Sequence, residues 1–408
     1  MSTNRRVVVT GIGAVSAFGW GVGSLQAGMQ SGKTAIGDAK DFDTARHRTH
    51  VAGEVPAAPK EIQSSIHDWA RLSRADRFAV AAAEEALRHA DLAVQGPHCG
   101  VYWGGSTAGM LECEEYIARV LNVRPGSPHL RLLGSQQLNG PGDAVARALG
   151  VAGPVQNFSS ACASGGLAIG AAVDAVQIGE VETAIAGGAD SLCQLTYGGF
   201  NSLRSVDGYP CRPFRADRAG LSLGEGAGVL VLETPDHAEK RGGHPLAEVR
   251  GFGASCDAHH MTAPHPEGDG ILAAMEDALS AAGLEPSELG FINSHGTGTP
   301  HNDSAEARAY SRLLGNCRAE VPLTATKALV GHVLGAAGAL EAVATVIALV
   351  EAVIHPTPGK EAADPDLGVD LVVGKERPLE DKMIGISTNL AFGGANAALV
   401  LEAWVEAR

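Results

Sequence analysis

The chain has 408 residues, long enough for two domains or for one large body with a substantial core. Its 45% apolar and 19% charged residues are the balance of an ordinary globular protein. The formal net charge of −15 argues against a nucleic-acid or membrane-surface binder, because phosphates are bound by clustered Lys and Arg, but it leaves room for a local basic patch that meets an acidic protein.

The first predicted element is a β-branched strand at residues 6–10, which ends in the glycine-rich Gly11-Ile-Gly-Ala-Val-Ser. Strand followed by glycines is typical of dinucleotide sites. However, Ser16 replaces the third glycine of Gly-x-Gly-x-x-Gly, and no acidic residue closes a second strand about 20 residues later. We interpret the glycines as a tight turn from strand to loop.

Two kinds of segment occur once in each half of the chain. A glycine turn feeds an apolar strand that ends in Glu at residues 223–233 and again at 392–402. A short turn runs into an Ala-rich helix at residues 158–178 and again at 324–349. Two α/β halves of similar plan would bury these apolar helices between their sheets. We expect the halves to join within residues 234–245.

Three features favour a reduced, cytoplasmic protein. Residues 1–9 hold too few consecutive apolar side chains for a signal peptide. The most apolar stretch, residues 339–354, contains two glutamates and is too short to span a bilayer, so we expect a buried helix there. The seven cysteines are odd in number and form no Cys-x-x-Cys pair, which argues against a disulfide scaffold or a zinc site.

The first candidate for chemistry is Cys162, in Ser160-Ala-Cys-Ala-Ser-Gly-Gly, between an apolar strand and a helix predicted to begin at about Ala163. A thiol at a helix N-terminus lies at the positive end of the helix dipole, which lowers its pKa toward a reactive thiolate. Neighbouring backbone N–H groups can hold an oxyanion. The alternative is a small buried cysteine that only fills space.

Two histidines favour the catalytic interpretation of Cys162. His295 lies in Asn293-Ser-His-Gly-Thr-Gly-Thr-Pro, and His332 ends Lys327-Ala-Leu-Val-Gly-His. Each stands beside glycines at the end of a predicted strand or the start of a helix, where a side chain is held on a rigid edge and can point into a cleft. Other histidines lack this setting and are assigned surface or packing roles: His98, His259, His260, His265 and His301.

Together these motifs resemble the β-ketoacyl-(acyl-carrier-protein) synthases of the KAS I/II type, within the thiolase-like superfamily. Ala-Cys-Ala-Ser-Gly, His-Gly-Thr-Gly-Thr-Pro and Lys-x-x-x-Gly-His occur in the order and spacing of that family, and the resemblance covers essentially the whole chain. It implies a thiolase-like five-layered αβαβα fold built from two similar halves. Residues 1–240 would carry the nucleophilic cysteine, and residues 241–408 the two catalytic histidines.

The resemblance also implies a decarboxylative Claisen condensation. An acyl group would move from the phosphopantetheine arm of an acyl carrier protein to Cys162, since a thiolate is both a nucleophile and a leaving group. Malonyl-carrier protein would then lose CO2, and the enolate would attack the thioester. Imidazole N–H donors from His295 and His332 would stabilise the enolate oxygen without a metal or any cofactor besides the arm that the carrier brings.

Further roles follow from the resemblance alone. The backbone N–H groups of Cys162 and Phe392 would hold the acyl oxyanion, with Phe392 and Gly393 in a gating loop, and Lys327 would pair with Glu341. Thr297 and Thr299 would hydrogen-bond the pantetheine arm, whereas the nearby acids Asp303 and Glu306 are assigned structural roles.

Two departures from the family concern the gate and the acyl pocket. Leu390-Ala-Phe392-Gly-Gly replaces Phe-Gly-Phe-Gly-Gly, so Ala391 narrows the backbone freedom around Phe392, and Leu221 stands where a Phe is common. Ala108 takes a position that is often bulky. We therefore expect a roomier pocket for longer or unusual acyl chains, unless Met110 or Phe200 refills the space.

Partners are expected from charge and from the resemblance. Arg71, Arg74 and Arg77 are spaced to share one side of a helix, and with Arg204 they are candidates for docking an acidic carrier protein. A solvated helix face is the alternative. The resemblance implies a homodimer, or a heterodimer with a chain-length-factor-like subunit, and neither a nucleic acid nor a membrane.

Three other classes fit less well. A degradative thiolase needs a second catalytic cysteine in a C-terminal motif, and a KAS III-type enzyme uses Cys-His-Asn. A non-catalytic chain-length subunit normally lacks the nucleophile that Cys162 supplies. The pathway stays open between fatty-acid elongation and a specialised polyketide, polyene or other lipid route, toward which Ala108 and Ala391 point.

Overall fold

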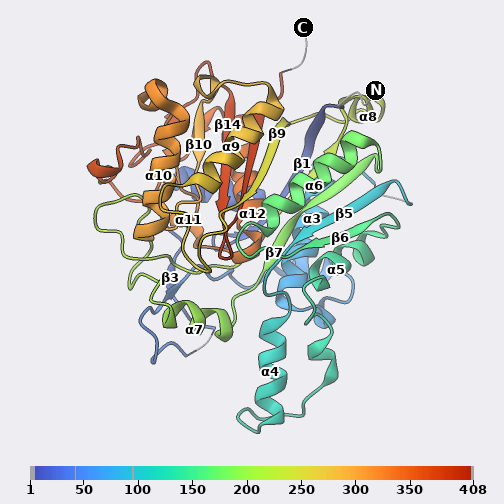
Figure 1. The fold of residues 1–408 in the computed structure, drawn as a ribbon. Helices are drawn as coiled ribbons and strands as arrows, with labels where there is room; N and C mark the ends of the chain where they lie inside the picture. The colour runs from blue at the N-terminus through green and yellow to red at the C-terminus, as the bar shows by residue number, and fades with distance from the viewer. Residues whose placement is uncertain (1–4, 42, 94–95, 406–408) are drawn as a thin grey trace.

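The computed structural model describes residues 5–41, 43–93 and 96–405, so the first four residues of the N-terminal segment lie outside it. The described chain is built on one large mixed β-sheet (Figure 1). Across the sheet the strands are β11 (Leu323–Thr324), β10 (Phe291–Asn293), β14 (Ile384–Leu390), β15 (Ala395–Ala403), β9 (Ala247–Cys256), β1 (Val7–Ser16), β8 (Gly226–Glu233), β7 (Thr183–Asp190), β5 (Cys99–Gly104) and β6 (Val155–Phe158), with β2 (Gly19–Trp20) beside β1.

The two parts of the sheet meet where β1 pairs with β9 through Val7–Val9 only. On the N-terminal side β5 runs parallel to β6 and β7, and on the C-terminal side β10 runs parallel to β11 and β14. The strands in between pair antiparallel. Outside this sheet lie two short pairs: β3 (Gly37–Asp38) with β4 (Val51–Ala52), and β12 (Val353–Ile354) with β13 (Arg377–Pro378).

Two apolar helices, α6 (Ser164–Ile178) and α12 (Ala337–Glu351), contact each other and strands from both parts of the sheet. Strand residues alternate between faces, so Leu230 and Leu232 pack on the side of these helices, while Val229 and Val231 pack on the opposite side. Both helices are long and apolar enough to cross a membrane, but most of each is buried in the protein interior. The expectation of a buried helix at residues 339–354 is thereby confirmed for α12, which ends at Glu351.

The remaining helices cover the outer faces. Helices α3 (Arg74–His89) and α5 (Gly140–Leu149) cover the N-terminal part of the sheet, and α9 (Asp269–Ala282) with α10 (Pro300–Leu314) covers the C-terminal part. A projecting arm is formed by α4 (Met110–Val120) and η2 (Leu130–Leu133) (Figure 1). The other helices are short or peripheral: α1 (Val22–Ser31), α2 (Lys60–Ser65), η1 (Trp69–Arg71), α7 (Gln194–Ser202), α8 (Pro235–Lys240), η3 (Pro286–Glu288), η4 (Gly315–Glu320), α11 (Lys327–Val330), η5 (Leu334–Ala336) and η6 (Pro365–Leu367).

The glycines near the N-terminus correct one interpretation. Strand β1 continues through Ser16, so Gly11 and Gly13 lie inside a strand and not in a turn. A Cβ at Gly11 would lie 2.1 Å from the backbone oxygen of Ala86, and one at Gly13 would lie 1.8 Å from that of Ala82. These glycines therefore let α3 pack directly on the backbone of β1.

The repeated segments fold as the sequence predicts. Glycine turns lead into β8 and β15, and both of these strands are almost wholly buried. The Ala-rich segments form α6 and, after the short helix η5, α12. Residues 234–245 contain α8, which stands between the last strand of the first repeat and β9. The exact boundary between the halves stays a prediction.

Candidate active site

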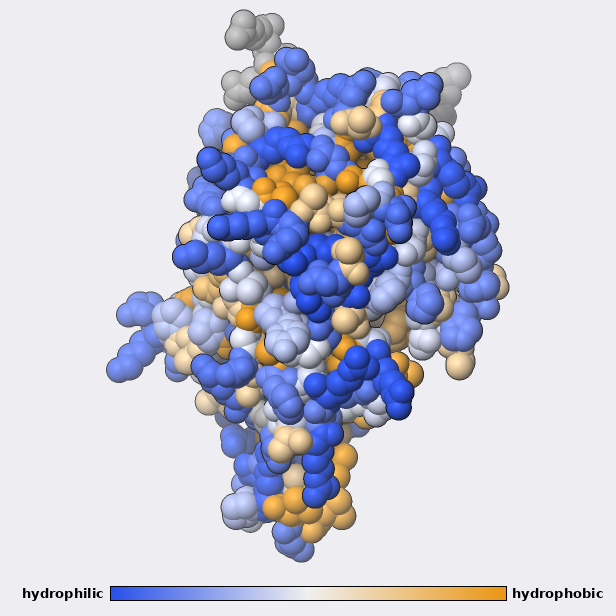
Figure 2. All heavy atoms as spheres, turned by 90° about the vertical axis from the view of Figure 1, so that its left-hand side faces the viewer, coloured by the Kyte–Doolittle hydropathy of each residue, from blue (hydrophilic) through white to orange (hydrophobic). Residues whose placement is uncertain are grey.

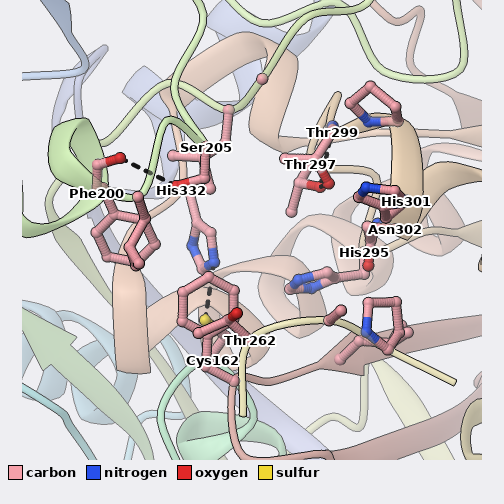
Figure 3. Close-up of a pocket in the computed structure, with 18 of the residues that line it drawn as sticks. Cys162, Phe200, Ser205, Thr262, His295, Thr297, Thr299, His301, Asn302 and His332 are labelled. Carbon is pink, nitrogen blue, oxygen red and sulfur yellow. Dashed lines mark hydrogen bonds between the residues drawn. The ribbon is translucent and has the colours of Figure 1, made fainter. Parts of the chain in front are cut away.

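Three segments that are distant in the sequence bring Cys162, His295 and His332 together (Figure 3). Cys162 lies between β6 and α6, His295 follows β10, and His332 lies between α11 and η5. The Sγ of Cys162 is 3.0 Å from Nε2 of His332, and the two imidazole rings are 5.4 Å apart between centroids. All three side chains are buried at one end of a cavity of about 410 Å³.

Backbone strain occurs beside two of these residues. Ala161, immediately before Cys162, has φ 45°, and Leu334, two residues after His332, has φ 55°. Non-glycine residues rarely adopt this left-handed region, and such strain is concentrated at functional sites. The N–H of Leu334 donates to Nδ1 of His332 at 3.1 Å. The strained turn therefore fixes the orientation of that ring.

The hydrogen bonds determine which nitrogen of each imidazole carries the proton. Because Nδ1 of His332 accepts from Leu334, its proton is on Nε2, facing Cys162. Nδ1 of His295 accepts from Nζ of Lys327 at 3.0 Å, so its Nε2 is also a donor. Burial, followed by the nearby charge of Lys327, holds the pKa of both histidines well below the usual range. The site thus contains two neutral N–H donors.

Lys327 is the centre of a buried hydrogen-bond network. Its Nζ also donates to the backbone oxygen of His295 at 2.7 Å and forms an ion pair with Glu341. The side chains of both partners are only 2% exposed. Burial raises the pKa of Glu341, and Lys327 and Asn389 oppose that shift. Asn389 donates to the second oxygen of Glu341 at 2.6 Å.

Asn389 was missed in the sequence, although one signal was available. It is a polar amide near the end of the apolar strand β14, immediately before the predicted gating loop that begins at Leu390. A second missed residue is Asp190, whose carboxylate accepts from the backbone N–H groups of Ser106 and Gly335. It thereby ties the loop after β5 to the turn that carries His332.

The expected low pKa of the Cys162 thiol is wrong for the resting site. Burial raises this pKa to about 11, although Lys327 and a hydrogen bond from the backbone N–H of Phe392 act in the opposite direction. Cys162 lies two residues before the first residue of α6, but the residue is buried, with 6% of its surface exposed. Desolvation of the thiolate therefore outweighs its favourable neighbours.

Phe392 closes one side of the cavity. Its ring stacks on that of Phe200 from α7, with centroids 5.4 Å apart and an angle of 27° between the planes. Gly393 has φ 88°, and its N–H donates to the backbone oxygen of Met261 at 2.8 Å. Ala391, which replaces the family glycine, donates its N–H to Ala395. Backbone hydrogen bonds on both sides of Phe392 therefore fix the turn in which it lies.

Thr297 and Thr299 line the cavity on the side of His295, and their hydroxyl oxygens are 3.0 Å apart. Two buried carboxylates accept hydrogen bonds from the backbone of the loop that contains these threonines. Glu306 accepts the N–H groups of His295 and Gly296 at 2.9 and 2.8 Å, and Asp303 accepts those of Phe214 and Gly298 at 2.7 and 3.1 Å. Burial raises their pKa values, to about 7 for Glu306 and about 6 for Asp303. This geometry agrees with a structural role for both acids.

Ala108 lies outside the lining of the cavity beside Cys162, whereas Phe200 belongs to it. Ala108 is fully buried with φ 45°, and its N–H donates to Asp190 at 3.2 Å. Its influence on acyl-chain length stays a prediction.

The arginines expected to dock a carrier are separated by the fold. Arg71 lies in η1 and is exposed, so the predicted shared helix face is wrong for this residue, whereas Arg74 and Arg77 both lie in the first turn of α3. Arg74 donates to the buried carboxylate of Glu225 at 2.8 Å and also pairs with Asp41. Its charge is thus already paired within the fold, which argues against a docking role for Arg74. Arg204 is exposed and lines the cavity.

Two histidines that the sequence gave no reason to select also line the cavity. His260 lies in the loop after β9, and His301 is the second residue of α10. Both are exposed, in contrast to the buried pair His295 and His332. Neither His260 nor His301 has a glycine directly next to it, unlike the buried pair, although His301 follows the Gly-Thr-Gly-Thr-Pro segment that contains Thr297 and Thr299.

A buried cysteine beside two neutral imidazole donors in a cavity is an arrangement that can carry out acyl transfer through a thioester. Residues 4–238 match the family described as "Beta-ketoacyl synthase, N-terminal domain", and residues 246–361 match "Beta-ketoacyl synthase, C-terminal domain". The chain therefore belongs to the beta-ketoacyl synthase family, the condensing enzymes that form β-ketoacyl thioesters.

Individual relatives extend over nearly the full length. A 3-oxoacyl-[acyl-carrier-protein] synthase 2 from Synechocystis sp. is 34% identical over 408 residues, which cover 98% of each chain. The solved ishigamide ketosynthase/chain length factor is 33% identical with a TM-score of 0.92, covering 99% of this chain and 100% of the other. A type II PKS acyl-carrier protein in complex with its ketosynthase matches at 27% identity and a TM-score of 0.89, covering 98% and 100%.

Proposed function

We propose that Cys162 accepts an acyl group from a carrier-borne thioester and that His295 and His332 then promote its condensation with malonyl-carrier protein. The 3.0 Å approach of His332 Nε2 to Cys162 Sγ, with His295 presenting a second donor, carries this proposal. Attack by the sulfur forms a thioester bond and releases the carrier thiol. The sulfur is later the leaving group when a carbon nucleophile attacks the acyl carbon.

The two imidazoles suit the decarboxylation step. Loss of CO2 from a malonyl thioester leaves an electron pair that is delocalised onto the thioester oxygen as an enolate. Two neutral Nε2–H donors in a buried site stabilise this charge, and one such donor is typically worth about 3 kcal/mol. The lowered pKa of both histidines keeps the rings neutral, and the hydrogen bonds accepted at each Nδ1 leave the proton on Nε2, where it can be donated to the enolate oxygen.

The acyl oxyanion is assigned to the backbone N–H groups of Cys162 and Phe392. The contact of the Phe392 N–H with the Cys162 sulfur supports this assignment, because the acyl carbon would be attached at that atom. Phe392 and Gly393 form the gate, and movement of Phe392 requires its ring to leave Phe200. Thr297 and Thr299 are placed on the wall along which a pantetheine arm would lie.

A second subunit of the same fold is proposed to complete the enzyme, either another copy or a chain-length-factor-like partner. Strand β6 is the edge of the described sheet, and most of its residues are exposed. The projecting arm also carries large apolar side chains that are 48 to 75% exposed: Ile117, Val120, Leu121, Val123 and Leu130. Figure 2 shows hydrophobic surface near the end of this arm. Similarity to a ketosynthase/chain length factor supports the heterodimer as one alternative.

The five-layered αβαβα description belongs to the same proposal, with residues 1–240 and 241–408 as similar halves. It is supported by the repeated glycine-fed strands β8 and β15 and by the central position of α6 and α12. For the pathway, we propose a specialised acyl chain over ordinary fatty-acid elongation, which Ala391 in the gate supports.

A reconstituted condensation tests the proposal. The protein is mixed with acyl-carrier protein and malonyl-carrier protein labelled in the free carboxyl group, and both CO2 release and the β-ketoacyl product are measured. The proposal predicts one CO2 per product and loss of product with Cys162→Ala. Product formation by that variant at the wild-type rate would refute the role of the cysteine. The length of the product distinguishes fatty-acid from specialised chemistry.

A further inference from the structure

Asp190, the last residue of β7, is a fully buried carboxylate that has no part in the proposed chemistry. Its Oδ1 accepts the backbone N–H groups of Thr107 and Ala108 at 2.8 and 3.2 Å. Its Oδ2 accepts the backbone N–H of Gly335 and the hydroxyl of Ser106, both at 2.7 Å. A buried carboxylate is stable only when such donors surround it, so the two segments that supply them are bound to each other through Asp190.

Both of these segments contain strained backbone. Ala108 has φ 45° and Leu334 has φ 55°, in the left-handed region that non-glycine residues rarely adopt. Such strain persists only where surrounding contacts hold it, and here the contacts are made by one carboxylate. The N–H of Leu334 is also the donor to Nδ1 of His332. The turn that Asp190 holds is therefore the turn that orients this imidazole ring.

The loop after β5 also contacts the segment that carries Cys162. A Cβ at Gly104 would lie 2.4 Å from the backbone nitrogen of Gly165, so the loop packs directly on the first turn of α6. The N–H of the residue after Gly104 donates at 3.2 Å to the backbone oxygen of the last residue of β6, four residues before the cysteine. The loop thus lies against the cysteine segment on one side and is bound through Asp190 to the turn of His332 on the other.

We propose that Asp190 is a positioning residue for the condensation, which holds His332 at hydrogen-bond distance from Cys162. This inference rests on the proposed function, because the 3.0 Å contact between Nε2 and Sγ matters only if the sulfur accepts the acyl group. Asp190 lies outside the lining of the cavity, so it acts on the reaction through the residues that it holds. A misplacement of about 1 Å can slow an enzymatic reaction about 100-fold, which makes such a hold consequential.

Asp190→Asn tests this role, since it keeps the size of the side chain but replaces one acceptor oxygen by an NH2 group that cannot accept a hydrogen bond. Acylation of Cys162 by acyl-carrier protein and release of CO2 from malonyl-carrier protein are measured separately. Both rates should fall roughly 10- to 100-fold, with an unchanged KM for either carrier protein. Loss of acylation would distinguish this variant from His295→Ala, in which Cys162 should still be acylated.

A double-mutant cycle separates positioning from a general structural role. In the His332→Ala background, Asp190→Asn should slow CO2 release by less than about threefold further, because the ring that Asp190 positions is already absent. Equal losses in the wild-type and His332→Ala backgrounds would show that Asp190 acts independently of His332, and would overturn the inference.

Two milder variants keep the inference testable if Asp190→Asn does not fold. Ser106→Ala and Thr107→Val each remove one hydroxyl that donates to the same carboxylate, at 2.7 and 2.9 Å. The Ser106 hydroxyl also accepts the N–H of Gly335 at 3.2 Å, whereas the Thr107 hydroxyl contacts the other oxygen of Asp190. Ser106→Ala should therefore slow CO2 release more than Thr107→Val does. Equal or reversed effects would contradict the hold on the His332 turn.

Glu85→Gln is the matched control. The carboxylate of Glu85 also accepts two backbone N–H groups, from Ala14 and Val22 at 2.9 and 2.8 Å, but it lies outside the cavity lining. This variant should lose stability and retain the wild-type rates; slowing as large as that of Asp190→Asn would overturn the inference. A folded Asp190→Asn variant with rates within about threefold of the wild type would do the same while leaving the proposed function standing. If the wild type itself places no acyl group on Cys162, the proposed function fails and the inference falls with it.

Discussion

Nζ of Lys327 lies 3.0 Å from Nδ1 of His295 and 2.7 Å from the backbone oxygen of the same residue. One buried cation therefore fixes both the proton position and the orientation of this ring. The backbone N–H of Leu334 does the same for His332. Both arrangements direct an Nε2–H group into the cavity, although one uses a side chain and the other a strained turn.

Substitution of each histidine should affect acylation and decarboxylation to different extents. His295→Ala and His332→Ala are each expected to slow decarboxylation of malonyl-carrier protein roughly 100- to 1,000-fold, the usual cost of losing one oxyanion donor. Of the two histidines, His332 is the one hydrogen-bonded to the sulfur in the described structure, so Cys162 of the His295→Ala variant should still be acylated. Release of CO2 and acylation are measured separately. A decarboxylation rate within tenfold of the wild-type rate in either variant would contradict the claim that both histidines donate a hydrogen bond to the enolate oxygen.

The ion pair of Lys327 and Glu341 should be essential to stability because its members are almost inaccessible to water. Lys327→Met leaves an uncompensated buried carboxylate, which is expected to lower the free energy of unfolding by about 3 to 5 kcal/mol. Lys327→Met combined with Glu341→Gln should recover part of this loss. Urea denaturation provides the measurement.

The matched control is Lys382→Met, which removes an exposed ion pair with Glu320 at 3.3 Å and should cost less than about 1 kcal/mol. Equal losses in the buried and exposed variants would show that Lys327 and Glu341 are not energetically coupled.

The raised pKa of Cys162 predicts a specific pH dependence of alkylation. A thiol with a pKa of about 11 is protonated at neutral pH, so its thiolate fraction grows tenfold with each pH unit below that value. Alkylation by iodoacetamide, followed on the peptide that contains Cys162, should accelerate by about tenfold per unit between pH 7 and 9.5. Replacing the more accessible Cys256 and Cys317 by Ala removes competing sites. A rate that levels off below pH 8 would show a preformed thiolate.

Cys162, His295 and His332 could be selected from the sequence because the residues next to them form a recognisable local pattern. Glycines beside His295 and His332 and small residues around Cys162 are readable in the chain, and so are the glycine turns before β8 and β15. The pKa of Cys162 could not be read in this way, since it depends on burial by distant segments. Gly11 and Gly13 were misjudged for the same reason, because their need for close packing comes from α3.

The arginines illustrate another limit. Spacing predicted one helix face for Arg71, Arg74 and Arg77, but a helix boundary separates Arg71 from the other two. The buried partner of Arg74, Glu225, is 151 residues away. Similarly, nothing next to His260 in the sequence indicates a cavity, and His301 was assigned a surface or packing role although it lies two residues after Thr299. Contacts between segments of distant sequence decide these assignments, and only the folded chain supplies them.

Charge reversal at two arginines should have different effects. Arg204→Glu is expected to raise the KM for acyl-carrier protein several-fold, with weaker salt dependence, because Arg204 is an exposed charge beside the cavity mouth. Arg74→Glu instead places a carboxylate beside the buried Glu225 and should cost about 3 to 5 kcal/mol in stability. Steady-state kinetics at two ionic strengths and urea denaturation separate the outcomes. An unchanged KM for Arg204→Glu would remove this residue from the docking surface.

The most direct measurement of the central claim is the site of acyl attachment. The protein is incubated with a labelled acyl-carrier protein in the absence of malonyl substrate, digested, and analysed by mass spectrometry. The account predicts one acyl group per chain, on the peptide that contains Cys162, removable by hydroxylamine, and absent from Cys162→Ser under thiol-selective conditions. Acylation at another residue, or condensation that proceeds with no acyl group ever attached to Cys162, would contradict it.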